Sequence, residues 1–260
     1  MQDNTTFENK VFLITGGGTG IGREVARRVV EGGGRVVLNG RRKEVLERAA
    51  AELDPSGSKV AIVAGSIADP TVSADMVETA IERFGRVDVL INNAGIFKPT
   101  PFLEHSADDF DAYVDVILRG TFFATQAAVP AMKTGGGGAV VNVGSMWADH
   151  AVGATPSSAY SAAKAGVHAL TRNLALELAG DGIRVNTVAP AVVETPVYET
   201  FMSAAEVAEV LPTFNAFHPI GRNGLPADVA EAVLFLAGEG SGWITGAVLP
   251  VDGGVTAGRP

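Results

Sequence analysis

The chain has 260 residues, of which 47% are hydrophobic and 32 are glycine, so it is long enough to bury a large core. Its net charge of −9 disfavours nucleic acid or an anionic membrane as a partner, and the absence of cysteine excludes disulfides, thiolate metal sites and a cysteine nucleophile. The N-terminus lacks the pattern of a signal peptide, and no apolar run is long enough to cross a bilayer. We therefore expect a cytoplasmic protein with one domain over 1–260, small molecules as partners and no metal.

Short apolar runs alternate with longer amphipathic stretches along the chain. The runs are rich in Val, Ile and Leu and show little apolar/polar alternation, as in strands covered on both faces. They lie at 11–15, 35–39, 59–64, 87–92, 139–145, 184–189 and 247–251. Helical patterns occupy the intervals at 22–31, 43–53, 71–84, 107–132, 157–178 and 227–237. This order predicts a single α/β domain, a Rossmann-type doubly wound parallel sheet flanked by helices, with ligands at the carboxyl ends of the strands.

A glycine-rich turn, TGGGTGIG at 15–22, follows the first predicted strand. Glycine permits a tight turn and a close approach to a pyrophosphate, whose charge is favoured at the N-terminus of the next helix. The spacing is TGxxxGxG rather than the common GxGxxG. Because the turn lies between a strand and a helix in a βαβ unit, it indicates a nucleotide site more strongly than an isolated glycine cluster would.

Three polar side chains further along the chain form a candidate catalytic group. Tyr160 and Lys164 are four residues apart on a predicted helix, hence on one face, and Ser145 ends the apolar run upstream. An ammonium near a phenol favours the phenolate, which brings a tyrosine pKa of about 10 closer to the working range of a proton-transfer catalyst. Any helix can carry Tyr and Lys at this spacing, so the pair gains its meaning from the motifs around it.

Taken together, these motifs resemble the classical short-chain dehydrogenase/reductase family, including its 3-oxoacyl-carrier-protein reductase and glucose dehydrogenase-like members. The resemblance rests on TGGGTGIG, on NNAG at 92–95, on Ser145 and on YSAAK at 160–164, in that order. NTVAP at 186–190 and VDGG at 251–254 extend it over nearly the whole chain. It implies an NAD(P)-dependent oxidoreductase that interconverts a carbonyl and a secondary alcohol, assembled as a homotetramer.

The resemblance also implies residue roles. Tyr160 would be the general acid/base, Lys164 would lower its pKa and bind the nicotinamide ribose, and Ser145 would donate a hydrogen bond to the substrate oxygen. The implied cofactor-binding positions are Gly16, Thr19, Gly20, Ile21, Gly22, Arg41, Arg42, Ser66, Ile67, Asn93, Ala94, Gly95, Tyr160, Lys164, Pro190, Val193 and Thr195. Ser66 stands where relatives carry an aspartate, which weakens that adenine contact or leaves it to the backbone.

The end of the second strand indicates which cofactor is preferred. The sequence LNGRR at 38–42 has no acid for the 2′-hydroxyl of NAD, and Arg41 lies where NADP-preferring relatives place an arginine. A guanidinium binds a phosphate bidentately, and cations at the start of a helix oppose its macrodipole unless an anion docks there. A solvated basic face is the alternative. Thr19 counts against NADP, because many NADP-binding relatives carry a second basic residue at this position. On the strength of Arg41 we expect NADP as the cofactor, with NAD as the alternative.

One position departs from the family pattern. The asparagine that helps relatives hold a relay water is replaced by Ile117, which has no donor or acceptor for it. Two hypotheses follow. The first is an active reductase with another proton relay, and the second is an NAD(P)-binding protein of low turnover that acts as a redox sensor or scaffold. The complete set of Ser145, Tyr160 and Lys164 favours the enzyme.

The substrate side of the site is the segment 192–218, which is predicted to be a flap. Its apolar side chains favour a substrate with hydrophobic surface, although packing against the domain or a subunit partner explains them equally well. They are Tyr198, Phe201, Met202, Phe214 and Phe217. Trp147 and His150 follow Ser145 closely and are candidates for the wall of the substrate pocket.

Overall fold

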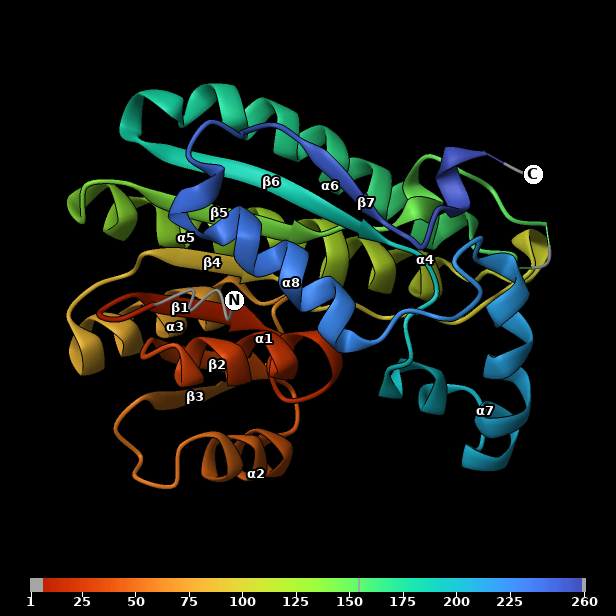
Figure 1. Cartoon of the computed structure of the whole chain (residues 1–260), viewed down its shortest axis with the longest axis horizontal. Helices are drawn as coiled ribbons and strands as arrows, with labels where there is room; N and C mark the ends of the chain where they lie inside the picture. Colours follow the sequence, from red (N-terminus) through yellow and green to blue (C-terminus); the bar gives the residue numbers. More distant parts are fainter. Residues whose placement is uncertain (1–6, 154, 259–260) are drawn as a thin grey trace.

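The computed structural model describes residues 7–153 and 155–258. Seven parallel strands form one sheet in the order β3-β2-β1-β4-β5-β6-β7 (Figure 1). The strands are β1 (Val11–Thr15), β2 (Arg35–Gly40), β3 (Val60–Ala64), β4 (Val89–Asn92), β5 (Gly138–Val143), β6 (Ile183–Pro190) and β7 (Val248–Val251). The chain order reverses between β1 and β4, and this switch point is where open α/β sheets bind ligands.

Helices cover both faces of the sheet. They are α1 (Gly20–Glu31), α2 (Lys43–Leu53), α3 (Pro70–Phe84), α4 (Ala107–Tyr113), α5 (Gly120–Thr134), α6 (Ser158–Glu177), α7 (Ala204–Val210) and α8 (Pro226–Ala237). In Figure 1, α1 and α8 lie in front of the sheet and α3 and α5 lie behind it, whereas α7 lies beyond the carboxyl ends of the strands. The predicted doubly wound fold is therefore confirmed. No helix among the described residues is long and apolar enough to cross a membrane.

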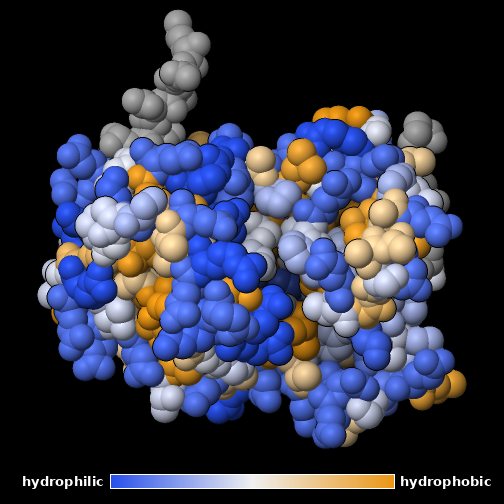
Figure 2. All heavy atoms as spheres, turned by 90° about the horizontal axis from the view of Figure 1, so that it is seen from below, coloured by the Kyte–Doolittle hydropathy of each residue, from blue (hydrophilic) through white to orange (hydrophobic). Residues whose placement is uncertain are grey.

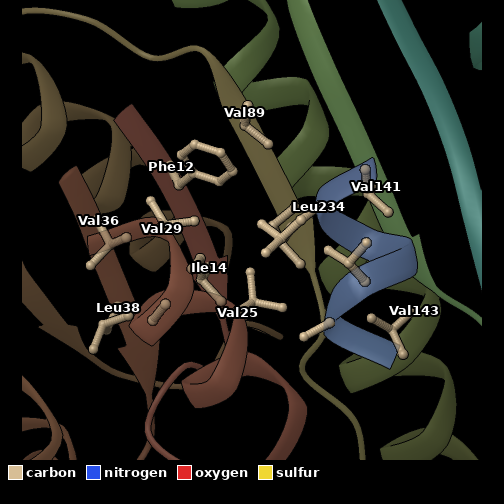
Figure 3. Packing of buried hydrophobic residues seen from close by; sticks show 14 of the residues in the cluster. Phe12, Ile14, Val25, Val29, Val36, Leu38, Val89, Val141, Val143 and Leu234 are labelled. Atoms are coloured by element: carbon tan, nitrogen blue, oxygen red, sulfur yellow. The ribbon is translucent and has the colours of Figure 1, made fainter. Parts of the chain in front are cut away.

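Alternate side chains of the strands supply two hydrophobic cores. Phe12 and Ile14 of β1 pack with Val25 and Val29 of α1 on one face (Figure 3). Leu13, between them in the chain, belongs to the core on the opposite face, which α3 and α5 complete. Because both faces are apolar, the strand carries an unbroken apolar run instead of an alternating one, which explains the sequence pattern.

The predicted long helix over 107–132 is wrong in one respect. Between α4 and α5 the chain forms a π-helical turn over Val114–Arg119, in which the amide of Gly120 donates to the carbonyl of Asp115. Apolar periodicity does not distinguish one extra residue in a turn, so the sequence gives no signal of it. Such π turns frequently occur at functional sites.

The predicted strand over 139–145 ends earlier than expected, at Val143. Gly144 and Ser145 therefore lie past the end of β5, where the Gly144 amide still donates to the carbonyl of Val188 in β6, and Ser145 caps a short 3-10 helix over Met146–Ala148. The predicted flap over 192–218 contains regular structure that the sequence analysis did not assign. It includes α7, which begins at a capping box between Ser203 and Glu206, and 3-10 turns on either side of α7.

Candidate active site

A cleft opens at the carboxyl ends of the first strands, beside the glycine-rich turn. The predicted cofactor-binding residues that line it are Gly16, Thr19, Arg41, Arg42, Ser66, Ile67, Ala94 and Gly95. Figure 2 views the molecule from the side of α2 and α7, and shows a hollow in the middle of a largely hydrophilic face. The cleft therefore lies at the switch point where the fold predicts a nucleotide.

The glycine-rich turn is closed by contacts that only small residues permit. A Cβ atom on Gly22 would lie 2.5 Å from the carbonyl oxygen of Gly16, so a larger side chain would force the turn open. Asn93 Nδ2 donates to the carbonyls of Thr15 and Gly16 at 2.9 and 3.1 Å, and the amides of Asn93 and Ala94 donate to Thr15 Oγ1. The Asn93 side chain thus ties the β4 loop to the turn, a structural task that the sequence analysis missed.

Two cations lie at the rim of the cleft. Arg41 and Arg42 are exposed, and neither guanidinium group has an ion pair or hydrogen bond with any residue that the structure describes. Lys43, which follows them, pairs with Glu47 at 3.6 Å on α2. Two unpaired guanidinium groups beside the start of a helix fit a bound anion better than a neutral ligand.

The other predicted cofactor positions lie around the cleft rather than in its lining. Pro190 ends β6, and Val193 is buried and pairs with Gly224 through a β-bridge. Thr195 contacts the glycine-rich turn, since a Cβ atom on Gly20 would lie 3.3 Å from the Thr195 Cβ atom. Ile21 packs against the core at the start of α1, and Gly22 is buried beside it.

The structure brings the three predicted catalytic residues together at the end of β5. Ser145 is buried, and its Oγ accepts a hydrogen bond from the amide of Trp147 at 3.2 Å. Tyr160 and Lys164 lie in the first turns of α6, with Lys164 Nζ 5.8 Å from the centroid of the Tyr160 ring. Lys164 is 5% exposed, and its Nζ donates to the carbonyl of Val143 at 2.6 Å.

Burial sets the protonation states of this group. It raises the pKa of Tyr160 to about 12, and a hydrogen bond from Ser145 offsets only part of that rise. Burial also lowers the pKa of Lys164 to about 8. The predicted net lowering of the Tyr160 pKa is not seen in this arrangement, because desolvation of the phenol outweighs any stabilisation of the phenolate by Lys164, whose Nζ donates to a backbone carbonyl. The phenol is protonated at neutral pH and can act as a proton donor.

Aromatic rings surround the Tyr160 phenol. Phe97 packs edge-on against it with ring centroids 5.0 Å apart, and Phe201 from the flap packs against Phe97 at 6.0 Å. Trp147 lies 6.3 Å from Phe217, in an apolar cluster that also holds Tyr198 and Phe214. His150, the other candidate for the pocket wall, is exposed. The surface near the catalytic group is thus apolar and aromatic.

Ile117 occupies the π-helical turn and is 1% exposed. It packs with Tyr113, Ala163 and Val167, so the position has apolar neighbours. Asp115, the nearest carboxylate in the chain, is exposed. The Tyr113 hydroxyl donates to the carbonyl of Lys98 at 2.8 Å and is therefore engaged elsewhere. The side chain at 117 thus contributes no polar atom to a proton relay.

A histidine that the sequence analysis left unassigned also reaches the site. His168 is 1% exposed, and its ring nitrogens contact the carboxylate of Asp149 at 3.0 Å and the amide of Ser145 at 3.5 Å. Its spacing in the sequence could have predicted this position, because His168 follows Lys164 by four residues and Tyr160 by eight, which places all three near one face of the helix.

Comparisons with known proteins find relatives over nearly the whole chain. The family model described as enoyl-(acyl carrier protein) reductase matches residues 16–256. The chain is 38% identical over 248 residues to a 3alpha-hydroxysteroid dehydrogenase of Mediterraneibacter gnavus, with 95% of this chain and 96% of that protein covered. It is 37% identical over 248 residues to the 3-oxoacyl-(acyl-carrier-protein) reductase FabG of Thermotoga maritima, with 95% and 98% covered.

A solved structure gives the same result. The crystal structure of a short-chain type dehydrogenase/reductase from Mycobacterium marinum superimposes with a TM-score of 0.91 at 31% identity, and covers 98% of this chain and 99% of that one. Family model, relatives and structure all span nearly the whole chain. The protein therefore belongs to the short-chain dehydrogenase/reductase family of NAD(P)-dependent oxidoreductases, which act on alcohol and carbonyl groups.

Proposed function

We propose that the protein is an NADP-preferring carbonyl reductase and alcohol dehydrogenase for substrates with a large apolar surface. The observation that carries the proposal is the meeting of Ser145, Tyr160 and Lys164 at the end of β5, next to the nucleotide cleft. A partly buried phenol, a buried ammonium and a buried hydroxyl together can move one proton and stabilise one developing negative charge.

Each of the three residues has a defined task in carbonyl reduction. A nicotinamide dinucleotide held in the cleft would supply the hydride. Tyr160, protonated because its pKa is raised to about 12, donates its proton to the substrate oxygen as negative charge develops there. Ser145 Oγ accepts from the Trp147 amide, and its O–H, which donates to Tyr160 in this structure, would donate to the same oxygen when a substrate is bound. Lys164, close to the ring of Tyr160, favours the phenolate that remains.

The cofactor preference rests on the unpaired cations at the rim. Replacing Arg41 with Ala should raise the KM for NADPH about 10- to 100-fold, since a hydrogen bond to a charged group is worth about 1.5–3 kcal/mol. The KM for NADH should not change, because that cofactor has no phosphate at this position. Steady-state kinetics with both cofactors measure the effect.

Arg48→Ala is the matched control, because Arg48 is exposed on α2 and outside the cleft lining, and its loss changes the net charge equally. It should leave both KM values unaltered. Equal weakening of NADPH and NADH by Arg41→Ala would refute the assignment of Arg41 to the 2′-phosphate.

The apolar substrate class is supported by the rings near the phenol. Phe97, Phe201 and the cluster around Trp147 provide extended hydrophobic contact but few polar groups to orient a small hydrophilic substrate. The 3alpha-hydroxysteroid dehydrogenase among the relatives has a name that specifies a bulky alicyclic alcohol. Because an L-rhamnose 1-dehydrogenase of Sphingomonas is 37% identical, the relatives' names do not decide between the two classes, and the aromatic rings are what favour cyclic or aryl ketones over sugars.

The test is oxidation of NADPH and of NADH with a panel of ketones that differ in apolar area, from acetone through cyclohexanones and aryl ketones to ketosteroids. Turnover should rise with apolar area and should prefer NADPH. If calorimetry shows that NADPH binds while none of the panel, including 3-oxoacyl esters, is reduced or its alcohol oxidised, the low-turnover binding protein becomes the better explanation.

Ile117 distinguishes these two functions further. Ile117→Asn should lower the free energy of unfolding by about 1–3 kcal/mol, because it buries an amide among apolar side chains. For an enzyme whose relay does not use this position, kcat should not increase. Thermal unfolding and steady-state kinetics on the same preparation measure both quantities. A large gain in kcat would show that isoleucine is what keeps the native protein slow, and would favour the sensor or scaffold.

A further inference from the structure

His168 lies behind the catalytic group, in the third turn of α6, with its two ring nitrogens engaged on opposite sides. Nδ1 is 3.0 Å from an Asp149 carboxylate oxygen, and Nε2 is 3.5 Å from the backbone nitrogen of Ser145. A carboxylate accepts hydrogen bonds, so Nδ1 carries the proton and Nε2 accepts from the Ser145 N–H. Asp149 thereby selects the tautomer that can hold Ser145.

Gly144 makes this approach of the imidazole possible. A Cβ atom on Gly144 would lie 2.3 Å from His168 Nε2 and 2.6 Å from the Thr187 methyl carbon. The ring therefore fills the space that any larger residue at position 144 would need. Glycine is needed at position 144 because of this close contact and not because of its backbone conformation, since Gly144 is not among the residues with positive φ.

We propose that His168 is a positioning residue that holds Ser145 in place for proton and hydride transfer, with Asp149 fixing the tautomer of the imidazole. This inference rests on the proposed function, in which the Ser145 hydroxyl bonds the substrate oxygen. Ser145 is then held at two points, with its amide on His168 and its Oγ on the Trp147 amide. With the amide and Oγ fixed, only the hydroxyl proton of Ser145 can rotate, and it can be directed at the substrate oxygen.

The arrangement requires a neutral imidazole, because a protonated ring would carry a hydrogen on Nε2, and two donors, Nε2–H and the Ser145 N–H, would then face each other. The ionisable groups that act on His168 are Asp149, Lys164 and Arg172. Burial is the largest influence on the pKa of His168 and lowers it. The charges of Lys164 and Arg172 lower this pKa further, whereas Asp149 raises it. Burial within the fold thus keeps the ring in the accepting form at neutral pH.

The kinetic test compares His168→Leu with His168→Gln. Leucine fills the space without an acceptor, so kcat should fall about tenfold or more, while the Kd for NADPH stays constant. Glutamine places an amide oxygen near the position of Nε2 and should restore most of kcat. A purely structural role would lower the melting temperature and leave kcat per folded molecule unchanged in both variants. Either that result, or equal loss of kcat in both, would overturn the proposal.

Gly144→Ala provides an independent arm. With His168 present, the added methyl must displace the ring, and kcat should fall as in His168→Leu. In a His168→Ala background only the contact with the Thr187 methyl group remains, so the same substitution should lower kcat much less than it does with His168 present. Additive losses in this double-mutant cycle would contradict the proposed contact.

A third readout needs no turnover and separates this inference from the proposed function. Nitrogen-15 NMR of the wild-type protein at neutral pH should show His168 as the Nδ1–H tautomer, and Asp149→Ala should abolish that preference. An Nε2–H tautomer in the wild type would overturn the positioning role even if the enzyme is active. The expected tautomer in a protein that reduces no substrate would instead place the failure in the proposed function.

Discussion

Replacing Tyr160 with Phe should lower kcat for ketone reduction about 10²- to 10⁴-fold, the usual contribution of a positioned proton donor. The substitution removes only the hydroxyl, so the ring keeps its edge-on contact with Phe97 at 5.0 Å. Because burial raises the pKa of Tyr160 to about 12, the native phenol is protonated at neutral pH and its proton is the one lost. Steady-state kcat with NADPH, measured beside the melting temperature, separates lost chemistry from lost stability.

Tyr113→Phe is the matched control for this prediction. Tyr113 is buried and its ring centroid lies 6.2 Å from that of Tyr160, but its hydroxyl is hydrogen-bonded to the backbone of Lys98. Losing these two hydrogen bonds should cost about 1–3 kcal/mol of stability and leave kcat nearly intact. A Tyr160→Phe variant that retains the native rate, or a control that loses as much, would remove the assigned acid/base from the mechanism.

The fold could be predicted because its signals are local and repeated. Apolar runs such as the one in β1 are buried on both faces, and this shows in the sequence as a lack of alternation. Prediction failed where the structure departs from a regular element by only one or two residues. The π turn at Val114–Arg119 and the early end of β5 at Val143 change hydrogen bonding without changing the apolar pattern.

The sequence predicted which residues gather around the cleft and at the end of β5, but not the contacts that their side chains make. Asn93 closes the glycine-rich turn through its own amide, a contact between segments 77 and 78 residues apart that spacing along the chain cannot reveal. The contact between Gly144 and His168 is also hidden from the sequence, because the glycine leaves room for a ring that comes from α6. The pKa of Tyr160 was predicted in the wrong direction, because motif spacing carries no information on desolvation.

Replacing Lys164 with Met should make the protein more stable at neutral pH, by about 1–3 kcal/mol, while removing most of its activity. Lys164 is 5% exposed and its pKa falls from 10.5 to about 8, which means that folding penalises its charged form. The Nζ hydrogen bond to the Val143 carbonyl recovers part of that cost and is lost in the variant. Methionine has a similar length and leaves no buried charge. The native lysine thus trades stability for function.

The pH dependence of this stability difference identifies its cause. The folded-state pKa of about 8 lies below the unfolded value of 10.5, so the penalty in the native protein is complete below pH 8 and disappears as the pH rises toward 10.5. The advantage of Lys164→Met in urea unfolding should therefore be largest at about pH 7 and much smaller at about pH 10. Lys133→Met, which removes a half-exposed lysine paired with Asp181 at 2.9 Å, should show no such narrowing. A Lys164→Met protein that is less stable than the native one at neutral pH, or an advantage that is constant with pH, would mean that the buried ammonium is not the destabilising group.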